Sequence, residues 1–191
     1  MKTILAAATL LATASFAHAA PQTYNLDPSH SQVVFSYDHL GFSTTYGMFS
    51  GFDGTIEFDA EAPENSSVSI EIPVSSMLTG WDARDQHFLS GDFFNADANP
   101  VATFQSTSIE PTGENTATMT GDLTIAGTTQ PVTFDLTFNN AGVHPMQQKE
   151  WMGANATTTI MRSDFGLGAF APNVGDEVEL IVSLEAGIAD E

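Results

Sequence analysis

The sequence contains no cysteine and very few cations. Without cysteine, disulfide bonds, thiolate metal sites and thiol catalysis are all excluded. Only 4 Lys plus Arg residues stand against 24 Asp plus Glu residues, so the formal net charge is −20 at pH 7. Nucleic-acid binding needs cations that neutralise phosphates, and anionic lipid headgroups attract basic segments. The composition therefore argues against nucleic acid and against a charged membrane surface as partners.

Long apolar runs are also scarce, and the one concentrated apolar stretch lies near the N-terminus, over residues 4–16. It follows Lys2 and precedes Ala17-His18-Ala19, a pattern that is typical of a cleavable secretory signal peptide. An uncleaved anchor is the alternative, but the stretch is shorter than the roughly 20 residues that a spanning helix needs. We therefore expect a signal peptide over residues 1–19, a mature domain over residues 20–191, and a periplasmic protein without stable membrane insertion.

Alternation of apolar and polar residues dominates residues 24–184. In residues 32–39, for example, every second residue is Val, Phe, Tyr or His. Such a period of two is typical of β-strands with one apolar face and one wet face. An antiparallel sheet of about eight strands hides its apolar face and its edges by closing on itself, so we expect an all-β protein with an extended antiparallel β-barrel. The other segments with this pattern are residues 68–72, 101–109, 116–125, 130–139, 153–161 and 177–185.

Two segments interrupt the alternation. Residues 42–58 interleave aromatic residues with glycines, which indicates the bulges and bends that barrels need at their corners. Residues 82–89 are the best candidate for a helix, with Asp82 as its N-cap and Asp85 near the positive end of its dipole. Phe88 and Leu89 make this segment apolar on one side, so we expect a short helix that covers one end of the barrel.

Catalytic and metal-binding motifs are absent from the pattern. Ser29-His30-Ser31 invites interpretation as part of a hydrolase triad, but it lies in a turn without a nucleophile-elbow pattern. The histidines that follow the signal peptide show none of the usual metal-ligand spacings. No glycine-rich phosphate loop opens a helix. We therefore expect a protein that is not an enzyme and that needs neither a metal nor a cofactor.

Four polar side chains deserve separate predictions. His39 lies on the apolar face of its strand and His87 on the predicted helix, so both are candidates for hydrogen bonds to the headgroup of a ligand. Arg84 and Arg162 are two of the three cations that follow the signal peptide. Because arginine forms bidentate pairs and carboxylates are abundant, we expect ion pairs that fix the helix and the last loop, with ligand anchoring as the alternative.

Seven short sequence blocks follow one another over residues 24–186. The blocks are Asp27-Pro28-Ser29-His30-Ser31, His39-Leu40-Gly41-Phe42-Ser43, Arg84-Asp85-x-His87, Asp92-Phe93-Phe94, Gly121-Asp122-Leu123-Thr124-Ile125, Arg162-Ser163-Asp164-Phe165-Gly166 and Val174-Gly175-Asp176. In this order, and after a signal peptide, they resemble the YceI-like family of secreted polyisoprenoid-binding proteins. The sequence departs from that family at Ala126, where relatives often carry a basic or imidazole side chain.

The resemblance implies a lipocalin-like barrel that carries a long-chain amphiphile, such as a polyisoprenoid, a quinone or a fatty-acid derivative, in its interior. A second hypothesis is a stress or redox accessory that presents a tailed quinone to a membrane electron-transfer partner. A third is a barrel filled by the 14 Phe residues that serves only as an interaction module. A two-fold homodimer stays open, since symmetric dimers are the commonest oligomers. The candidate ligand-binding residues are Val33, Phe35, Tyr37, His39, Phe42, Phe49, Ile70, His87, Phe88, Leu89, Leu123, Ile125, Phe134, Leu136 and Leu180.

Overall fold

The computed structural model describes residues 21–190, which form ten β-strands, one α-helix and three short 3-10 helices. The signal peptide predicted over residues 1–19 lies outside the described residues. Within residues 21–190, no helix has both the length and the apolar character needed to cross a membrane. The elements are β1 (Gln22–Leu26), β2 (Gln32–His39), β3 (Ser43–Ser50), β4 (Asp53–Phe58), η1 (Pro63–Asn65), β5 (Ser67–Pro73), η2 (Val74–Ser76), α1 (Asp82–Leu89), β6 (Val101–Pro111), β7 (Thr116–Ile125), β8 (Thr128–Val143), β9 (Glu150–Met161), η3 (Arg162–Phe165) and β10 (Glu177–Ile188).

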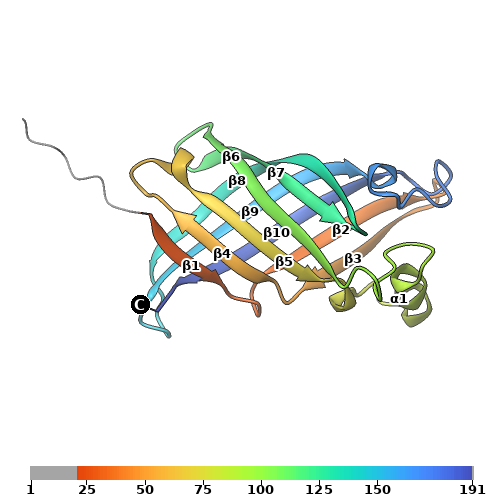
Figure 1. Cartoon of the computed structure of the whole chain (residues 1–191), viewed down its shortest axis with the longest axis horizontal. Coiled ribbons are helices and arrows are strands. Elements are labelled where there is room, and N and C mark those ends of the chain that lie inside the picture. Colours follow the sequence, from red (N-terminus) through yellow and green to blue (C-terminus); the bar gives the residue numbers. More distant parts are fainter. Residues whose placement is uncertain (1–20, 191) are drawn as a thin grey trace, which may run out of the picture.

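The ten strands occupy eight positions in one antiparallel ring, which confirms the predicted barrel (Figure 1). Hydrogen bonds connect β1, β4, β5, β6, β7, β8, β9 and β10 in that order, and β10 pairs again with β1. Strand β2 continues the position of β1, because β10 pairs with β1 near Ala186 and with β2 near Ile181. Strand β3 pairs with β2 as β4 pairs with β1, so β3 and β4 also share one position.

The two ends of this barrel differ. At one end the ring is continuous, because β4 pairs with both β1 and β5. At the other end the outer edge of β3 meets Leu78 in an isolated bridge, and residues 74–100 with α1 cover this side (Figure 1). The loop before β10 reaches the same end, since Gly175 N donates to Asp38 O at 2.8 Å. We call this end, formed by the β2–β3 turn, α1 and residues 162–176, the mouth.

The hydrophobic core lies inside the ring. On β2, Val33 and Phe35 are buried while the residues between them are more exposed, as the period of two predicts. On β7, Met119 and Leu123 are buried on the same face, with Gly121 between them. The apolar faces of the strands therefore point toward a shared interior rather than toward a second layer.

The helix has the predicted bounds but a different N-terminus. Its N-cap is Trp81, whose carbonyl accepts hydrogen bonds from Arg84 N at 2.9 Å and Asp85 N at 3.1 Å. The prediction of Asp82 as the N-cap is therefore wrong, because Asp82 is already helical. The carboxylate that supports the helix start is that of Asp85, which accepts a hydrogen bond from Thr79 N at 2.9 Å.

The β8–β9 hairpin is longer than the alternation indicates. Strand β8 continues to Val143 because its last residues pair with the start of β9, where Val143 faces Glu150. The gap between the predicted strands at residues 130–139 and 153–161 is therefore reduced to a loop of residues 144–149. A register shift next to Asn139 accompanies this extension, and such a bulge conceals the period of two in the sequence.

Candidate ligand-binding site

The barrel encloses a cavity of about 570 Å³ that reaches the mouth. Its inner wall is made of apolar side chains that the alternation of β2, β5, β7 and β10 directs inward, such as Val33, Ile70, Leu123 and Leu180. The volume lies within the range of about 300–1,000 Å³ that is typical of small-molecule sites. The interior is therefore hollow at this end. We call this cavity the first chamber.

Polar groups of the first chamber gather at the mouth. The end of β2 contributes His39, the start of β3 contributes Ser43 and Thr45, and the helix contributes Arg84 and His87. Deeper positions of the lining on β2 and β3 carry valine and phenylalanine. This arrangement suits an amphiphile whose headgroup stays at the mouth while its apolar chain extends into the barrel.

Aromatic rings form a lid over the mouth. Phe88 of α1 lies 6.3 Å from Tyr37 of β2 and 5.0 Å from Phe93, measured between ring centroids. Phe93 in turn lies 6.2 Å from Phe170, which belongs to the loop before β10. Rings at these distances attract one another, so side chains join α1 to β2 and to the loop before β10. Backbone pairing of β2 with that loop, through the bridge between His39 and Val174, adds to these contacts.

Arg84 holds the approach to the helix in place. Its Nη2 donates to Thr79 O at 2.7 Å and its Nε donates to Thr79 Oγ1 at 2.9 Å. Its guanidinium also lies over the ring of Trp81, 5.8 Å from the centroid. These contacts fix the helix, as predicted, but through a backbone carbonyl, a hydroxyl and a ring instead of the expected carboxylate.

Arg162 does the same for the loop before β10. Its buried guanidinium donates to the backbone carbonyl of Gly175 at 2.8 Å, to those of Ala169 and Val174 at 2.9 Å each, and to that of Leu167. The loop wraps around the side chain, so its carbonyl oxygens take the place of the predicted carboxylate partner. Four acceptors in different directions match the several donors that a planar guanidinium presents.

The structure places most of the candidate ligand-binding residues around the first chamber. Leu136 lines a second cavity, described below, and Leu89 packs against the core without lining either cavity. Phe42 points away from the interior, with 89% of its surface exposed in the turn between β2 and β3. The residues that line the first chamber are Val33, Phe35, Tyr37, His39, Phe49, Ile70, His87, Phe88, Leu123, Ile125, Phe134 and Leu180.

Sequence reasoning missed several residues of the lining. Val178 and Val182 flank Leu180 at spacings of two, so the alternation that selected Leu180 was sufficient to find them. Phe104 follows from the pattern of β6 in the same way. Phe170 carried no such signal, because it lies in an irregular loop and reaches the cavity only through the fold.

A second cavity of about 310 Å³ lies toward the other end of the barrel. Small side chains on β7 and β9, including Ala117, Ala154 and Ala156, leave this space unfilled. Its rim contains residues 113–116, in the turn between β6 and β7. We call it the second chamber.

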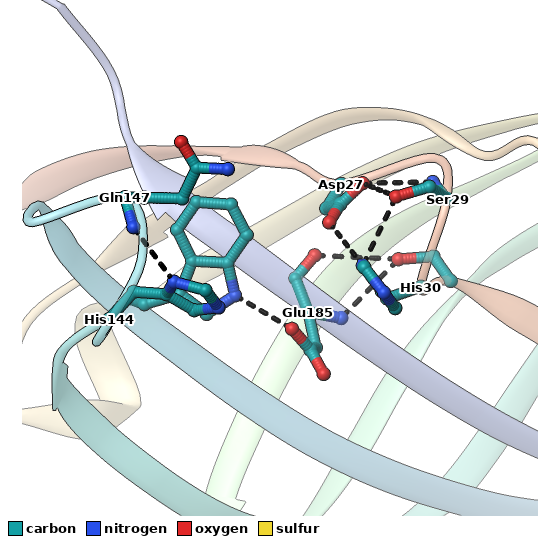
Figure 2. Close-up of polar contacts among 8 residues, drawn as sticks. Asp27, Ser29, His30, His144, Gln147 and Glu185 are labelled. Atoms are coloured by element: carbon teal, nitrogen blue, oxygen red, sulfur yellow. Dashed lines mark hydrogen bonds and ion pairs between the residues drawn. The ribbon is translucent and has the colours of Figure 1, made fainter.

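The turn between β1 and β2 holds the polar cluster that suggested a hydrolase (Figure 2). Ser29 Oγ donates to Asp27 Oδ1 at 2.6 Å, and Asp27 Oδ2 lies 2.6 Å from His30 Nδ1. Ser29 Oγ contacts the same ring nitrogen at 3.1 Å. A catalytic relay uses the two different nitrogens of the imidazole, one toward the serine and one toward the carboxylate. The geometry is therefore that of a hydrogen-bonded turn and does not form a triad.

Electrostatics stabilise this turn. The hydrogen bond and charge of Asp27 raise the pKa of His30 above its ordinary value. Partial burial alone would raise the pKa of Asp27, but hydrogen bonds from His30 and Ser29 more than offset it, so this pKa is lowered. The opposite directions indicate an ion pair between the two side chains.

The same cluster is the candidate for a metal site within residues 21–190. Ligand atoms of Asp27, His30 and Glu185 lie within 4.8 Å of one another. Glu185 accepts a hydrogen bond from Trp151 Nε1 at 2.8 Å, and its backbone bonds with Ser31 Oγ fasten the turn to β10 (Figure 2). Each of the three potential ligands thus has a protein partner, and together they join the turn to the barrel wall.

Comparison with known proteins finds similar proteins over nearly the whole length of the barrel. The model of the YceI-like domain matches residues 24–186. A UPF0312 protein of Pseudomonas putida (strain W619) is 41% identical over 163 residues, which cover 85% of this chain and 84% of the relative. A UPF0312 protein of Pseudomonas savastanoi pv. phaseolicola is 38% identical over 181 residues, or 95% and 93% of the two chains.

Solved structures share the architecture. The crystal structure of Burkholderia cenocepacia BcnA is 28% identical with a TM-score of 0.75, covering 84% of this chain and 98% of that one. The YCEI protein of Campylobacter jejuni is also 28% identical, with a TM-score of 0.72 and coverage of 80% and 90%. A polyisoprenoid binding domain from Saccharophagus degradans is 15% identical with a TM-score of 0.68, over 88% and 99% of the two chains, which shows a common fold.

Proposed function

Because this chain belongs to the YceI-like family, we propose that it is a binding protein that carries a long-chain amphiphile in the first chamber. The chemical class is a polyisoprenoid, a tailed quinone or a fatty-acid derivative. The description of the Saccharophagus relative as a polyisoprenoid binding domain supports this choice of class. Such a ligand would enter and leave through the mouth when the aromatic lid moves aside.

The observation that carries the proposal is the hollow, apolar interior. A chamber of about 570 Å³ with valine, leucine, isoleucine and phenylalanine on its wall offers an apolar chain a site away from water. Each methylene that is buried there contributes about 0.8 kcal/mol. The affinity therefore comes mainly from the chain, whereas His39 and His87 at the mouth act on the headgroup.

We further propose that the mature domain, residues 20–191, acts in the periplasm and is not an enzyme. The N-terminal pattern of Lys2, an apolar stretch and an A-x-A site supports export with cleavage. The shared use of one imidazole nitrogen by Asp27 and Ser29 argues against a catalytic triad in this turn. N-terminal sequencing of the exported protein checks the location, and a mature form that still begins at Met1 contradicts it.

The test of the carrier function is organic extraction and mass spectrometry of the protein purified from its own host. We expect one isoprenoid, quinone or acyl compound per protein chain. The variant Leu180→Trp narrows the first chamber and should retain less of this compound. Its matched control is Ile181→Trp on the outer face of β10, where the side chain is 45% exposed, and this variant should keep the compound.

The outcomes separate the hypotheses. A protein that carries no lipid and takes up no added isoprenoid overturns the carrier function. A bound quinone that membranes reduce and reoxidise would assign the protein to the redox accessories. The headgroup contact has its own test, since His39→Ala should weaken retention of the ligand if His39 binds the headgroup, and unchanged retention would exclude that role.

A further inference from the structure

Four side chains separate the first chamber from the second. Ile70, Phe104, Phe134 and Val182 line both cavities, and they come from β5, β6, β8 and β10 on different sides of the ring. The interior is therefore one tunnel that is divided by a wall part of the way along its length.

The wall depends on contact between two phenylalanines on strands that are not neighbours. Phe104 of β6 and Phe134 of β8 are separated by β7, yet their ring centroids lie 5.3 Å apart at an interplanar angle of 80°. This edge-to-face arrangement is one that aromatic rings favour. The side chains cross the width of a whole strand to meet.

A glycine on the intervening strand explains the contact. Phe104 pairs with Leu123 and Phe134 pairs with Met119, and Gly121 lies midway between those partners on the same face of β7. A methyl group at Gly121 would lie 2.4 Å from Phe104 Cζ, so the ring occupies the space that a side chain would otherwise take. Phe104 thus leans over β7 until it reaches Phe134.

The side chains that form the wall are largely buried. Phe104 and Phe134 are 5% and 6% exposed, and Ile70 completes the layer at 6%. Protein interiors are close-packed, so an extended chain in the first chamber cannot pass this layer unless the rings move. The second chamber lies beyond the wall, where Ala154 and Ala156 contribute small side chains to its lining.

We propose that Phe104 and Phe134 are a stop that sets the longest apolar chain the first chamber accepts, and that the second chamber becomes an extension of the site only when this stop is removed. The inference rests on the proposed carrier function. The stop makes the protein selective for chain length, in addition to any selectivity that the mouth exerts on the headgroup.

The experiment is a series of straight-chain primary alcohols of increasing length, which compete with an apolar fluorophore bound in the barrel. For the wild-type protein, affinity should rise about fourfold with each added methylene until the chain reaches the wall, and then stop rising. In Phe134→Leu the break should move to longer chains, because the shorter side chain opens the wall. Phe104→Leu, which trims the other ring, should move it in the same direction.

The control is Phe42→Leu, the same substitution at a residue that lines neither chamber. Its break should coincide with that of the wild type. A break that stays at the wild-type length in both wall variants, while they remain folded by circular dichroism and still bind alcohols, overturns the stop. Binding of no alcohol of any length, by the wild type or the variants, contradicts the carrier function itself and is therefore distinguishable.

Discussion

Replacement of Arg162 by methionine tests whether one buried cation organises the mouth. Methionine keeps much of the apolar stem but removes all the donors, so the carbonyls of Leu167, Ala169, Val174 and Gly175 lose their partner. At a net value of about 1 kcal/mol per hydrogen bond, four bonds give a loss of about 4 kcal/mol in the free energy of unfolding. Water that reaches the freed carbonyls lowers the cost, so we expect a loss of about 2–4 kcal/mol.

The assay is urea denaturation at neutral pH, with Arg162→Lys as the matched variant. Lysine keeps the charge but has a single nitrogen, which cannot reach carbonyls in four directions, so its loss should be smaller than that of methionine but still measurable. Because Leu167, Phe170 and Val174 line the first chamber, both variants should also bind ligand more weakly. A loss below about 1 kcal/mol for Arg162→Met would refute the reasoning, since four carbonyl oxygens that lose their donor should cost more than this.

The remaining predictions concern two other positions. His30→Gln removes the ion pair with Asp27, and the raised pKa of His30 means that the wild type is the more stable protein below the ordinary histidine pKa. This advantage should disappear as the pH rises through the raised pKa of His30, and also as the pH falls through the lowered pKa of Asp27. Thermal melts of both proteins from acid to alkaline pH measure it. A stability advantage of the wild type that persists at about pH 9 would contradict the ion pair. Gly47→Ala puts a methyl group 2.2 Å from Phe35 Cζ, so the ring must shift, and we expect a loss of about 1–3 kcal/mol in urea denaturation. Gly91→Ala, where a methyl group meets nothing within 4 Å, should change stability by less than about 0.5 kcal/mol, and equal losses in the two variants would count against the contact.

The sequence predicts the strands well, because a half-buried strand must alternate. Strand β2 pairs with β10 and places Phe35 opposite Leu180. The alternation had already assigned both residues to apolar faces, and the pairing brings these faces together in the lining of the first chamber. Phe42 shows where such reasoning ends. It follows Leu40 and Gly41, both with positive φ, so the chain turns there and the alternation of β2 no longer says which way the next side chain points.

The division of the interior had no comparable signal. In the sequence, Gly121 indicates only a less stable position in a strand, and Phe104 is one of many aromatic residues. Only the pairing of β6, β7 and β8 brings the glycine between the two phenylalanines. Likewise, the hollow volume depends on which side chains meet across the ring, and a composition with 14 Phe residues is compatible with a filled interior as well as with an empty one.

The pairing of the first strand with the last sets the order in which the protein can be assembled. Strand β10 bonds to β9 on one side and to β1 and β2 on the other, so it is the piece that completes the circle. A chain that has been synthesised only as far as residue 176 has every other strand but leaves β9 and β1 as open edges. Neither chamber has a complete lining at that stage, since Val182 of β10 lines both. The nascent chain therefore forms neither chamber completely until the residues of β10 have left the ribosome.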